Sequence, residues 1–209
     1  MTTSAEREGV RRNVQGQRVR EEILDAASRA MSEYGYDGAS ISRIIEATGL
    51  KRSSLYWQFD SKAAIAAAVM ERGARRFFDA TPLRRRRGGP GARLRSYLQD
   101  IADSLDEHQE FLRLFQILVL TNRDPQIAEV LEGVRAEART RMREFIASAF
   151  EDEGPERAGR VAERLAPLGV ALFDGYFLAA QIDGPEGRRR RVQDMAQALE
   201  HYGTALAGS

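Results

Sequence analysis

The sequence predicts an all-α protein with an N-terminal head of three helices and a C-terminal helical body, with about nine helices in all. Apolar residues recur with a helical period along almost every long segment. Alternating runs of β-branched and aromatic residues, which are typical of strands, are missing. Proline is scarce, and five of the six prolines stand where one helix can end and the next begin.

The head is expected to contain three helices and a longer connecting helix. The first runs from Gln17 to Tyr34 and ends at Gly35, because glycine tolerates the left-handed conformation found at many helix ends. We expect residues 1–16 to form a flexible arm and residues 17–80 to form the head domain. The later helices of this domain are expected at Ile41–Thr48, Arg52–Gln58 and Lys62–Asp79.

The body domain is expected over residues 92–209, after a linker rich in Arg, Gly and Pro at Thr81–Gly91. Pro167 lies inside a predicted helix and should kink it, because proline removes one backbone hydrogen bond. Two arginine runs, Arg84–Arg87 and Arg188–Arg191, are interpreted as solvated loop or helix ends. The body helices are expected at Ala92–Asp106, Gln109–Asn122, Gln126–Asp152, Glu156–Ile182 and Arg188–Leu206.

Composition excludes several classes of protein. The chain has 209 residues, of which 43% are hydrophobic and 30% charged, so it can bury a core. It has no cysteine, which excludes a disulfide scaffold, a thiolate zinc site and a cysteine nucleophile. The N-terminal residues lack the apolar core of a signal peptide, and no stretch approaches the roughly 20 apolar residues that span a bilayer. We therefore expect a cytoplasmic protein without a membrane partner, and no metal or cofactor.

The stretch from Ser40 to Phe59 predicts two short helices joined by a tight turn. Ser40 can cap the first helix, because a hydroxyl at that position accepts from free N–H groups of the first turn. Gly49 permits a sharp turn, and Leu50 supplies an apolar contact between the helices. Leu55 and Phe59, four residues apart, should face inward. Two helices joined in this way form a helix-turn-helix, whose second helix can enter a DNA major groove about 12 Å wide.

Cations, hydroxyls and aromatics make up the predicted outward face of the second helix. Lys62 follows a capping serine, Ser61, at the start of the next helix, where a cation is electrostatically unfavourable. Contact with a DNA phosphate would explain a lysine at this position, because a lysine and the free N–H groups at a helix start can bind the same anion. The residues of the outward face are Lys51, Arg52, Ser53, Ser54, Tyr56, Trp57 and Gln58.

These motifs resemble the signature of the TetR family of regulators. The similar segments are Ala39-Ser40, Gly49-Leu50 and Leu55-Tyr56-Trp57-Gln58-Phe59-Asp60-Ser61-Lys62, with Ile23-Leu24-Asp25-Ala26-Ala27 and Tyr34-Gly35-Tyr36 upstream. The resemblance implies a homodimeric repressor that binds a palindromic operator and leaves it when a small-molecule effector binds the body. An activator is equally compatible with the sequence. Ile45 and Gln58 depart from the family pattern, in which alanine and histidine are usual.

The resemblance places DNA contacts on the outward face and on the lysine beyond it. Tyr56 and Trp57 have packing as an alternative role, and Ser53 and Ser54 could simply begin a helix. Gln58 is left out because of its departure from the pattern. The predicted DNA-contacting residues are Ser40, Lys51, Arg52, Ser53, Ser54, Tyr56, Trp57 and Lys62.

The last two long helices predict a dimer. The helix at Glu156–Ile182 has apolar residues on two sides, so it should be covered on two sides. One side can pack on its own body and the other on a partner, with the last helix beside it. A central helix in a larger monomeric bundle is the alternative. The predicted interface residues are Leu165, Leu168, Leu172, Tyr176, Met195, Leu199 and Tyr202.

An apolar or amphipathic effector would need an apolar pocket in the body. Aromatic residues at helical spacing supply wall material, although such residues are more often core than pocket. The candidate pocket residues are Phe111, Phe115, Leu118, Asn122, Phe173, Tyr176 and Phe177.

Catalysis is not expected. The only histidines, His108 and His201, lie far apart, and Leu105 and Ala198 stand where a di-iron bundle would need glutamate. No Gly-x-Ser-x-Gly turn or phosphate-binding glycine loop is present. A helical ligand-binding protein without DNA binding remains an alternative, against which the basic and aromatic outward face argues.

Overall fold

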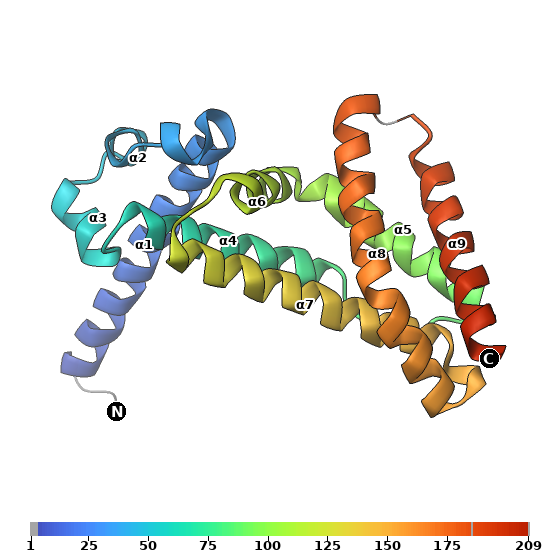
Figure 1. Cartoon of the computed structure of the whole chain (residues 1–209). Coiled ribbons are helices and arrows are strands. Elements are labelled where there is room, and N and C mark those ends of the chain that lie inside the picture. Colours follow the sequence, from blue (N-terminus) through green and yellow to red (C-terminus); the bar gives the residue numbers. More distant parts are fainter. Residues whose placement is uncertain (1–3, 185, 209) are drawn as a thin grey trace. The chain divides into compact units, whose positions relative to one another are not determined.

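The structure, a computed structural model, describes residues 4–184 and 186–208 and is all-α over them, as predicted (Figure 1). Within these residues there are nine α-helices, one short 3-10 turn and no strand. Every helix expected from the sequence is present, with ends that differ by a few residues except at the N-terminus. The elements are α1 (Ser4–Gly38), α2 (Ile41–Thr48), α3 (Arg52–Gln58), α4 (Lys62–Ala80), α5 (Pro90–Glu107), α6 (Gln109–Thr121), α7 (Pro125–Ala149), η1 (Glu151–Glu153), α8 (Pro155–Asp183) and α9 (Arg188–Gly208).

The chain divides into two compact units that do not follow the predicted boundary. The first unit joins the residues up to Arg75 with Gln109–Glu132, and the second joins Arg76–His108 with the residues from Gly133 on. Helices α4 and α7 each contribute to both units. The expected division into 17–80 and 92–209 did not place α6 with the head, because sequence order alone gives no sign of which distant helices pack together.

Helix α1 corrects the expectation of a flexible arm over residues 1–16. The helix begins at Ser4, and residues 1–3 lie outside the described part of the chain. No proline interrupts this segment, and its many Arg, Glu and Gln residues favour helix. At the other end Gly35 has φ 70° and ψ 172°, which breaks the regular helix at the residue predicted to stop it.

The first unit packs α1 against α2, α3 and α6 (Figure 1). Ile23, Met31 and Ile44 are completely buried at these contacts. Phe111 on α6 lies so close to Gly73 on α4 that a Cβ at Gly73 would stand 2.4 Å from its ring. Burial of each large apolar side chain contributes about 1.5–3 kcal/mol, so this shared core positions the short helices α2 and α3.

The second unit is built on α5, α8 and α9, and α8 and α9 run side by side in opposite directions (Figure 1). Tyr97 on α5 stacks on Phe145 of α7, with ring centroids 3.5 Å apart. Gly203 on α9 lets the helix backbone approach the buried ring of Phe150. These contacts join the helices of the unit into one core.

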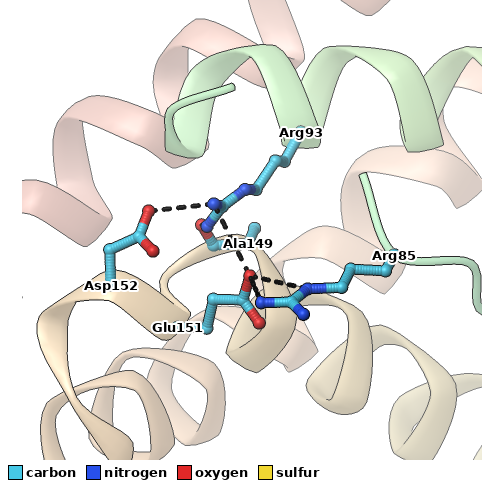
Figure 2. Close-up of polar contacts among 5 residues, drawn as sticks. All are labelled: Arg85, Arg93, Ala149, Glu151 and Asp152. Atoms are coloured by element: carbon cyan, nitrogen blue, oxygen red, sulfur yellow. Dashed lines mark hydrogen bonds and ion pairs between the residues drawn. The ribbon is translucent and has the colours of Figure 1, made fainter. Parts of the chain in front are cut away.

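A buried arginine ties the start of α5 to the end of α7 (Figure 2). Arg93, which is 9% exposed, donates from Nη1 to the carbonyl oxygen of Ala149 over 3.1 Å. Its Nη2 lies 2.9 Å from Asp152 Oδ2 and 3.5 Å from Glu151 Oε1. The linker joins the same cluster, because Arg85 donates to Glu151 Oε1 over 3.1 Å and 3.3 Å. The guanidinium of Arg93 thus satisfies a carbonyl that helix geometry leaves without an intrahelical donor.

Helix α8 continues through Pro167 from Pro155 to Asp183. Contrary to the expectation from the sequence, it is long and apolar enough to cross a membrane by length and composition. One such helix is weak evidence, because a core helix passes the same test. In this structure α8 packs on α9 and η1, and its buried side includes Val161, Leu165 and Phe173.

Candidate nucleic-acid interface

The turn between α2 and α3 has the geometry expected from its sequence. The Ser40 hydroxyl accepts a hydrogen bond from the Arg43 N–H over 3.2 Å and so caps α2. Gly49 ends the helix in the left-handed region, at φ 67° and ψ 9°, and donates to the Ile45 carbonyl over 2.9 Å. A residue with a Cβ is strained in this conformation, so glycine sets the angle at which α3 leaves α2.

Helix α3 has one buried side and one exposed side. Leu55 is 1% and Phe59 is 4% exposed, so both face inward as predicted. Tyr56 and Trp57 are 45% and 80% exposed, which removes packing in the core as the role of either ring. Exposure of an aromatic side chain to water is energetically unfavourable, and a partner surface that covers the ring removes this penalty.

The other predicted contact residues on α3 also reach solvent. Lys51, Arg52 and Ser53 are exposed and Ser54 is half-buried. The Arg52 guanidinium lies 5.9 Å from the centre of the Tyr56 ring. No acidic residue occurs between Gly49 and Phe59, so the exposed side of α3 carries positive charge, hydroxyls and aromatic rings only.

Gln58 holds α3 against α1. Its Nε2 donates to the Gly16 carbonyl over 3.0 Å, and its own carbonyl accepts from Arg20 Nη1 over 3.4 Å. The Arg20 guanidinium also lies 4.3 Å from the centre of the Phe59 ring. The sequence did not indicate this role for Arg20 or Gln58, because their partners lie about forty positions away along the chain. Gln58 was left out of the predicted contacts, and here it positions the helix.

Lys62 has intramolecular partners that the sequence did not reveal. Its Nζ donates to the carbonyl oxygens of Tyr36 at 2.9 Å and Asp37 at 3.4 Å. It also lies 4.3 Å from the centre of the Tyr36 ring. Burial raises the pKa of Tyr36, with Asp124 and Asp37 adding to the effect, so the ring stays a neutral phenol. The argument that only an anion explains Lys62 is therefore wrong, and its contact with DNA stays a prediction. The cap by Ser61, whose Oγ accepts from the Ala64 N–H over 3.0 Å, is confirmed.

The predicted effector residues do not form a set within either unit. Phe111, Phe115, Leu118 and Asn122 belong to the first unit, and Phe173, Tyr176 and Phe177 belong to the second. Most of them are core residues. Asn122 forms a local turn, because its Nδ2 donates to the Asp124 carbonyl and its Oδ1 accepts from the Asp124 N–H. Tyr176 alone of the seven lines a cleft found among the described residues of the second unit.

That cleft is polar, unlike the apolar pocket expected from the sequence. Its walls come from α5, from α8 and from the start of α9, which are far apart in the sequence. The arginine run at the start of α9 was interpreted as a solvated helix end, and its first three residues belong to these walls. The lining residues are Gln99, Asp103, Asp106, Tyr176, Gly187, Arg188, Arg189 and Arg190.

The predicted dimer residues separate into covered and exposed ones. Leu165 and Leu199 are completely buried, and Tyr176 and Met195 are at most 8% exposed. Their own chain already covers these four side chains, which removes them from the predicted dimer surface. Leu172 is half-buried, and Leu168 and Tyr202 are 40% and 43% exposed. Leu178 and Ile182 on α8, which the prediction did not include, are 55% and 77% exposed.

The N-terminal part of the chain matches a known family. The family model described as bacterial regulatory proteins, tetR family, matches residues 23–69, which include α2, α3 and the start of α4. The matched segment therefore contains the helix-turn-helix and its exposed face.

Curated relatives are similar over the same region. The HTH-type transcriptional repressor AcnR of Corynebacterium efficiens is 39% identical over 57 residues, which is 27% of this chain and 30% of AcnR. The A-factor receptor protein of Streptomyces griseus is 43% identical over 49 residues, or 23% of this chain and 18% of the receptor. The regulator IcaR of Staphylococcus aureus, named as a negative transcriptional regulator of the icaADBC biofilm operon, is 40% identical over 47 residues, or 22% of this chain and 25% of IcaR. The matched region thus spans less than a third of each relative.

Solved structures share the fold over most of the chain. NemR of Escherichia coli in its reduced form superposes with a TM-score of 0.68 at 17% identity, covering 86% of this chain and 95% of NemR. A tetR-family transcriptional regulator from Streptomyces coelicolor superposes with a TM-score of 0.66 at 21% identity, covering 90% of this chain and 83% of that one. At these identities the likeness concerns the fold alone.

Proposed function

We propose that this chain is a DNA-binding transcriptional repressor, because it belongs to the TetR family of bacterial regulatory proteins. The exposed side of α3 carries this proposal. It combines cations, hydroxyls and two exposed aromatic rings on a helix whose opposite side is anchored by Leu55 and Phe59. Helix α2 is capped and a glycine turn joins it to α3. A helix positioned in this way can place its exposed side in the major groove.

Repression is proposed over activation because AcnR is named as a repressor and IcaR as a negative regulator. The curated relatives are named as a repressor, a negative regulator and a receptor, which agrees with the expectation that this chain is not an enzyme. Such a protein acts on the bacterial chromosome, so we place it in the cytoplasm.

DNA binding is tested by selecting genomic fragments with the purified full chain and sequencing those retained. An enriched sequence, bound less tightly as salt rises, is expected from phosphate contacts. In a reporter fused to a promoter that contains this sequence, the protein should lower expression. If the retained fragments share no sequence, the proposed function fails; increased reporter expression would replace repression by activation.

A homodimer on a palindromic operator is part of the proposal. An apolar row along α8 supports it, with Leu168, Leu178 and Ile182 exposed at 40%, 55% and 77%. These residues recur at spacings of ten and four, so they lie near one side of the helix. A second copy can cover such a row with the same row in an isologous contact, and a two-fold dimer matches a palindrome.

The dimer is tested by light scattering at micromolar concentration. Leu178→Glu should convert a dimer to a monomer, because it places a charge in the apolar contact. Leu83→Glu is the matched control: Leu83 is 47% exposed but lies in the linker, not on α8. A monomeric wild-type chain would refute the dimer, and so would equal dimer stability in the two variants.

A further inference from the structure

The polar cleft of the second unit has a shape and lining that the proposed DNA interface does not use. Its volume is about 560 Å³, and it is surrounded by residues of α5, of α8 and of the start of α9 with the preceding Gly187. A cleft of this size is large enough for a metabolite, since ligand pockets usually fall between about 300 and 1,000 Å³. Its lining carries both signs of charge, with carboxylates on α5 and guanidinium groups at the start of α9.

The acidic wall lies on α5. Gln99 Nε2 donates to Asp103 Oδ1 over 2.8 Å, which leaves Asp103 Oδ2 available to a second donor. Asp106 is paired with Arg188, so much of its charge is neutralised within the protein. Asp103 therefore provides the carboxylate oxygen that a cationic group in the cleft would meet.

The basic wall lies at the start of α9. Arg189 and Arg190 are exposed, and neither forms an ion pair among the described residues. The first backbone bond of the helix runs from the Arg191 N–H to the Gly187 carbonyl over 2.9 Å. The N–H groups of the three preceding residues therefore have no helical acceptor. Consecutive arginines at this end oppose the helix dipole, so an anion bound here would relieve an unfavourable arrangement.

Tyr176 provides a donor from the third wall. It is 5% exposed and lines the cleft, and its hydroxyl forms no hydrogen bond with the described residues. Burial raises the pKa of this hydroxyl, and nearby Asp106 adds to the effect, so it carries its proton at neutral pH. The hydroxyl therefore has a donor to offer to a ligand oxygen in the cleft.

We propose that this cleft binds a zwitterionic small molecule. Its anionic group lies against Arg189, Arg190 and the free N–H groups of α9, and its cationic group lies against Asp103. Tyr176 donates to an oxygen of the ligand. A simple anion would leave Asp103 Oδ2 without a cationic partner, and a simple cation would leave Arg189 and Arg190 without an anionic one. That this ligand is the effector rests on the proposed repressor function.

Binding is tested by calorimetric titration of the full chain with three sets of probes. Glycine, β-alanine and γ-aminobutyrate are zwitterions with increasing charge separation. Acetate, propionate and butyrate lack the amine, and methylamine, ethylamine and propylamine lack the carboxylate. We expect at least one zwitterion to bind about tenfold more tightly than either matched single charge, since each lost charged contact weakens binding. If every zwitterion binds no better than its matched anion or amine, or fails to bind, the proposal is overturned.

Variants locate the binding. Tyr176→Phe keeps the packed ring and should weaken binding about fivefold, as expected for one lost hydrogen bond. Asp103→Asn should remove the preference for the zwitterion over the anion, and Arg190→Gln should weaken the anion as well. Arg160→Gln, an exposed arginine on α8 that does not line the cleft, is the control and should leave affinity unchanged. If Tyr176→Phe and Asp103→Asn both bind as wild type does, the ligand lies elsewhere and the proposal is wrong.

The effector role has a separate readout. The best-binding zwitterion should lower the affinity of the chain for its selected DNA, and Tyr176→Phe should shift this effect to higher ligand concentration. If the ligand binds in the cleft but DNA affinity is unchanged, the cleft is confirmed as a site and its effector role is overturned. If the chain binds no DNA, the repressor function fails, while the calorimetry still decides the cleft.

Discussion

Replacing Arg93 by methionine tests whether one buried guanidinium joins α5 to the end of α7. Methionine keeps most of the volume and removes every donor. The variant loses the charge-assisted bond to the Ala149 carbonyl, which is buried. Such a bond contributes about 1.5–3 kcal/mol. It also loses ion pairs to Glu151 and Asp152, whose side chains are 31% and 63% exposed, so each pair contributes at most about 1 kcal/mol.

The desolvation cost of the buried guanidinium, which the substitution removes, opposes this loss. Arg93 Nε is buried without a hydrogen-bond partner among the described residues, so removing the charge also relieves a desolvation cost. We expect a net destabilisation of about 2 kcal/mol, which lowers the Tm of a chain of this size by roughly 4–8 °C.

Arg85→Met is the matched control, since Arg85 contacts the same Glu151 oxygen but its side chain is 83% exposed (Figure 2). It should change stability by less than about 0.5 kcal/mol. Unfolding followed by circular dichroism in urea and on heating measures both variants. If they unfold alike, burial and the Ala149 contact contribute nothing, and the account of this cluster is refuted.

Three further predictions concern close packing at a glycine, the exposed ring of Trp57 and the buried phenol of Tyr97. Gly203→Ala places a Cβ 2.3 Å from the fully buried ring of Phe150, so it should destabilise by about 1–3 kcal/mol. The same change at Gly133 on α7, which has nothing within 4 Å, should stabilise by up to about 1 kcal/mol, and equal effects would contradict the packing. Trp57→Ala should leave the free energy of unfolding within about 0.5 kcal/mol of wild type and weaken DNA binding by about 1–3 kcal/mol; unchanged DNA affinity would remove Trp57 from the interface. Burial raises the pKa of Tyr97 from 10.0 to about 12, so this phenol contributes stability that is full below pH 10 and lost as the pH rises toward 12. Denaturation at several alkaline pH values should therefore show a shallower loss for Tyr97→Phe, and parallel curves would argue against the shift.

Local patterns explain why the helix-turn-helix was predictable from the sequence. Ser40 caps α2 and Gly49 ends it through contacts within three or four residues. The spacing of Leu55 and Phe59 decides which side of α3 is buried and leaves Trp57 exposed. Each of these features depends on neighbours in the sequence, so helical periodicity and capping rules are sufficient to find them.

Contacts between distant segments explain what was missed. The partners of Lys62 lie on α1, and those of Gln58 lie there too. Periodicity showed that α8 is apolar on two sides, but not that Leu165 is on the covered side and Leu178 on the exposed one. Which apolar side of α8 is covered depends on where α9 and η1 pack.

The polar cleft was missed for the same reason. Its walls come from three helices, and no local motif joins Asp103, Tyr176 and Arg190. The arginine run was visible, but its usual interpretation as a solvated helix end gave no reason to look for opposing carboxylates.

The exposed side of α3 is expected to bind duplex DNA of a specific sequence. The most direct measurement is the affinity of the full chain for a fragment selected from genomic DNA, taken over a range of salt concentrations, against a shuffled fragment of equal length. We expect the selected fragment to contain an inverted repeat with half-sites about one helical turn apart or a multiple of it, and the logarithm of the affinity to fall linearly with the logarithm of salt concentration. Equal affinity for the selected and shuffled fragments would contradict it.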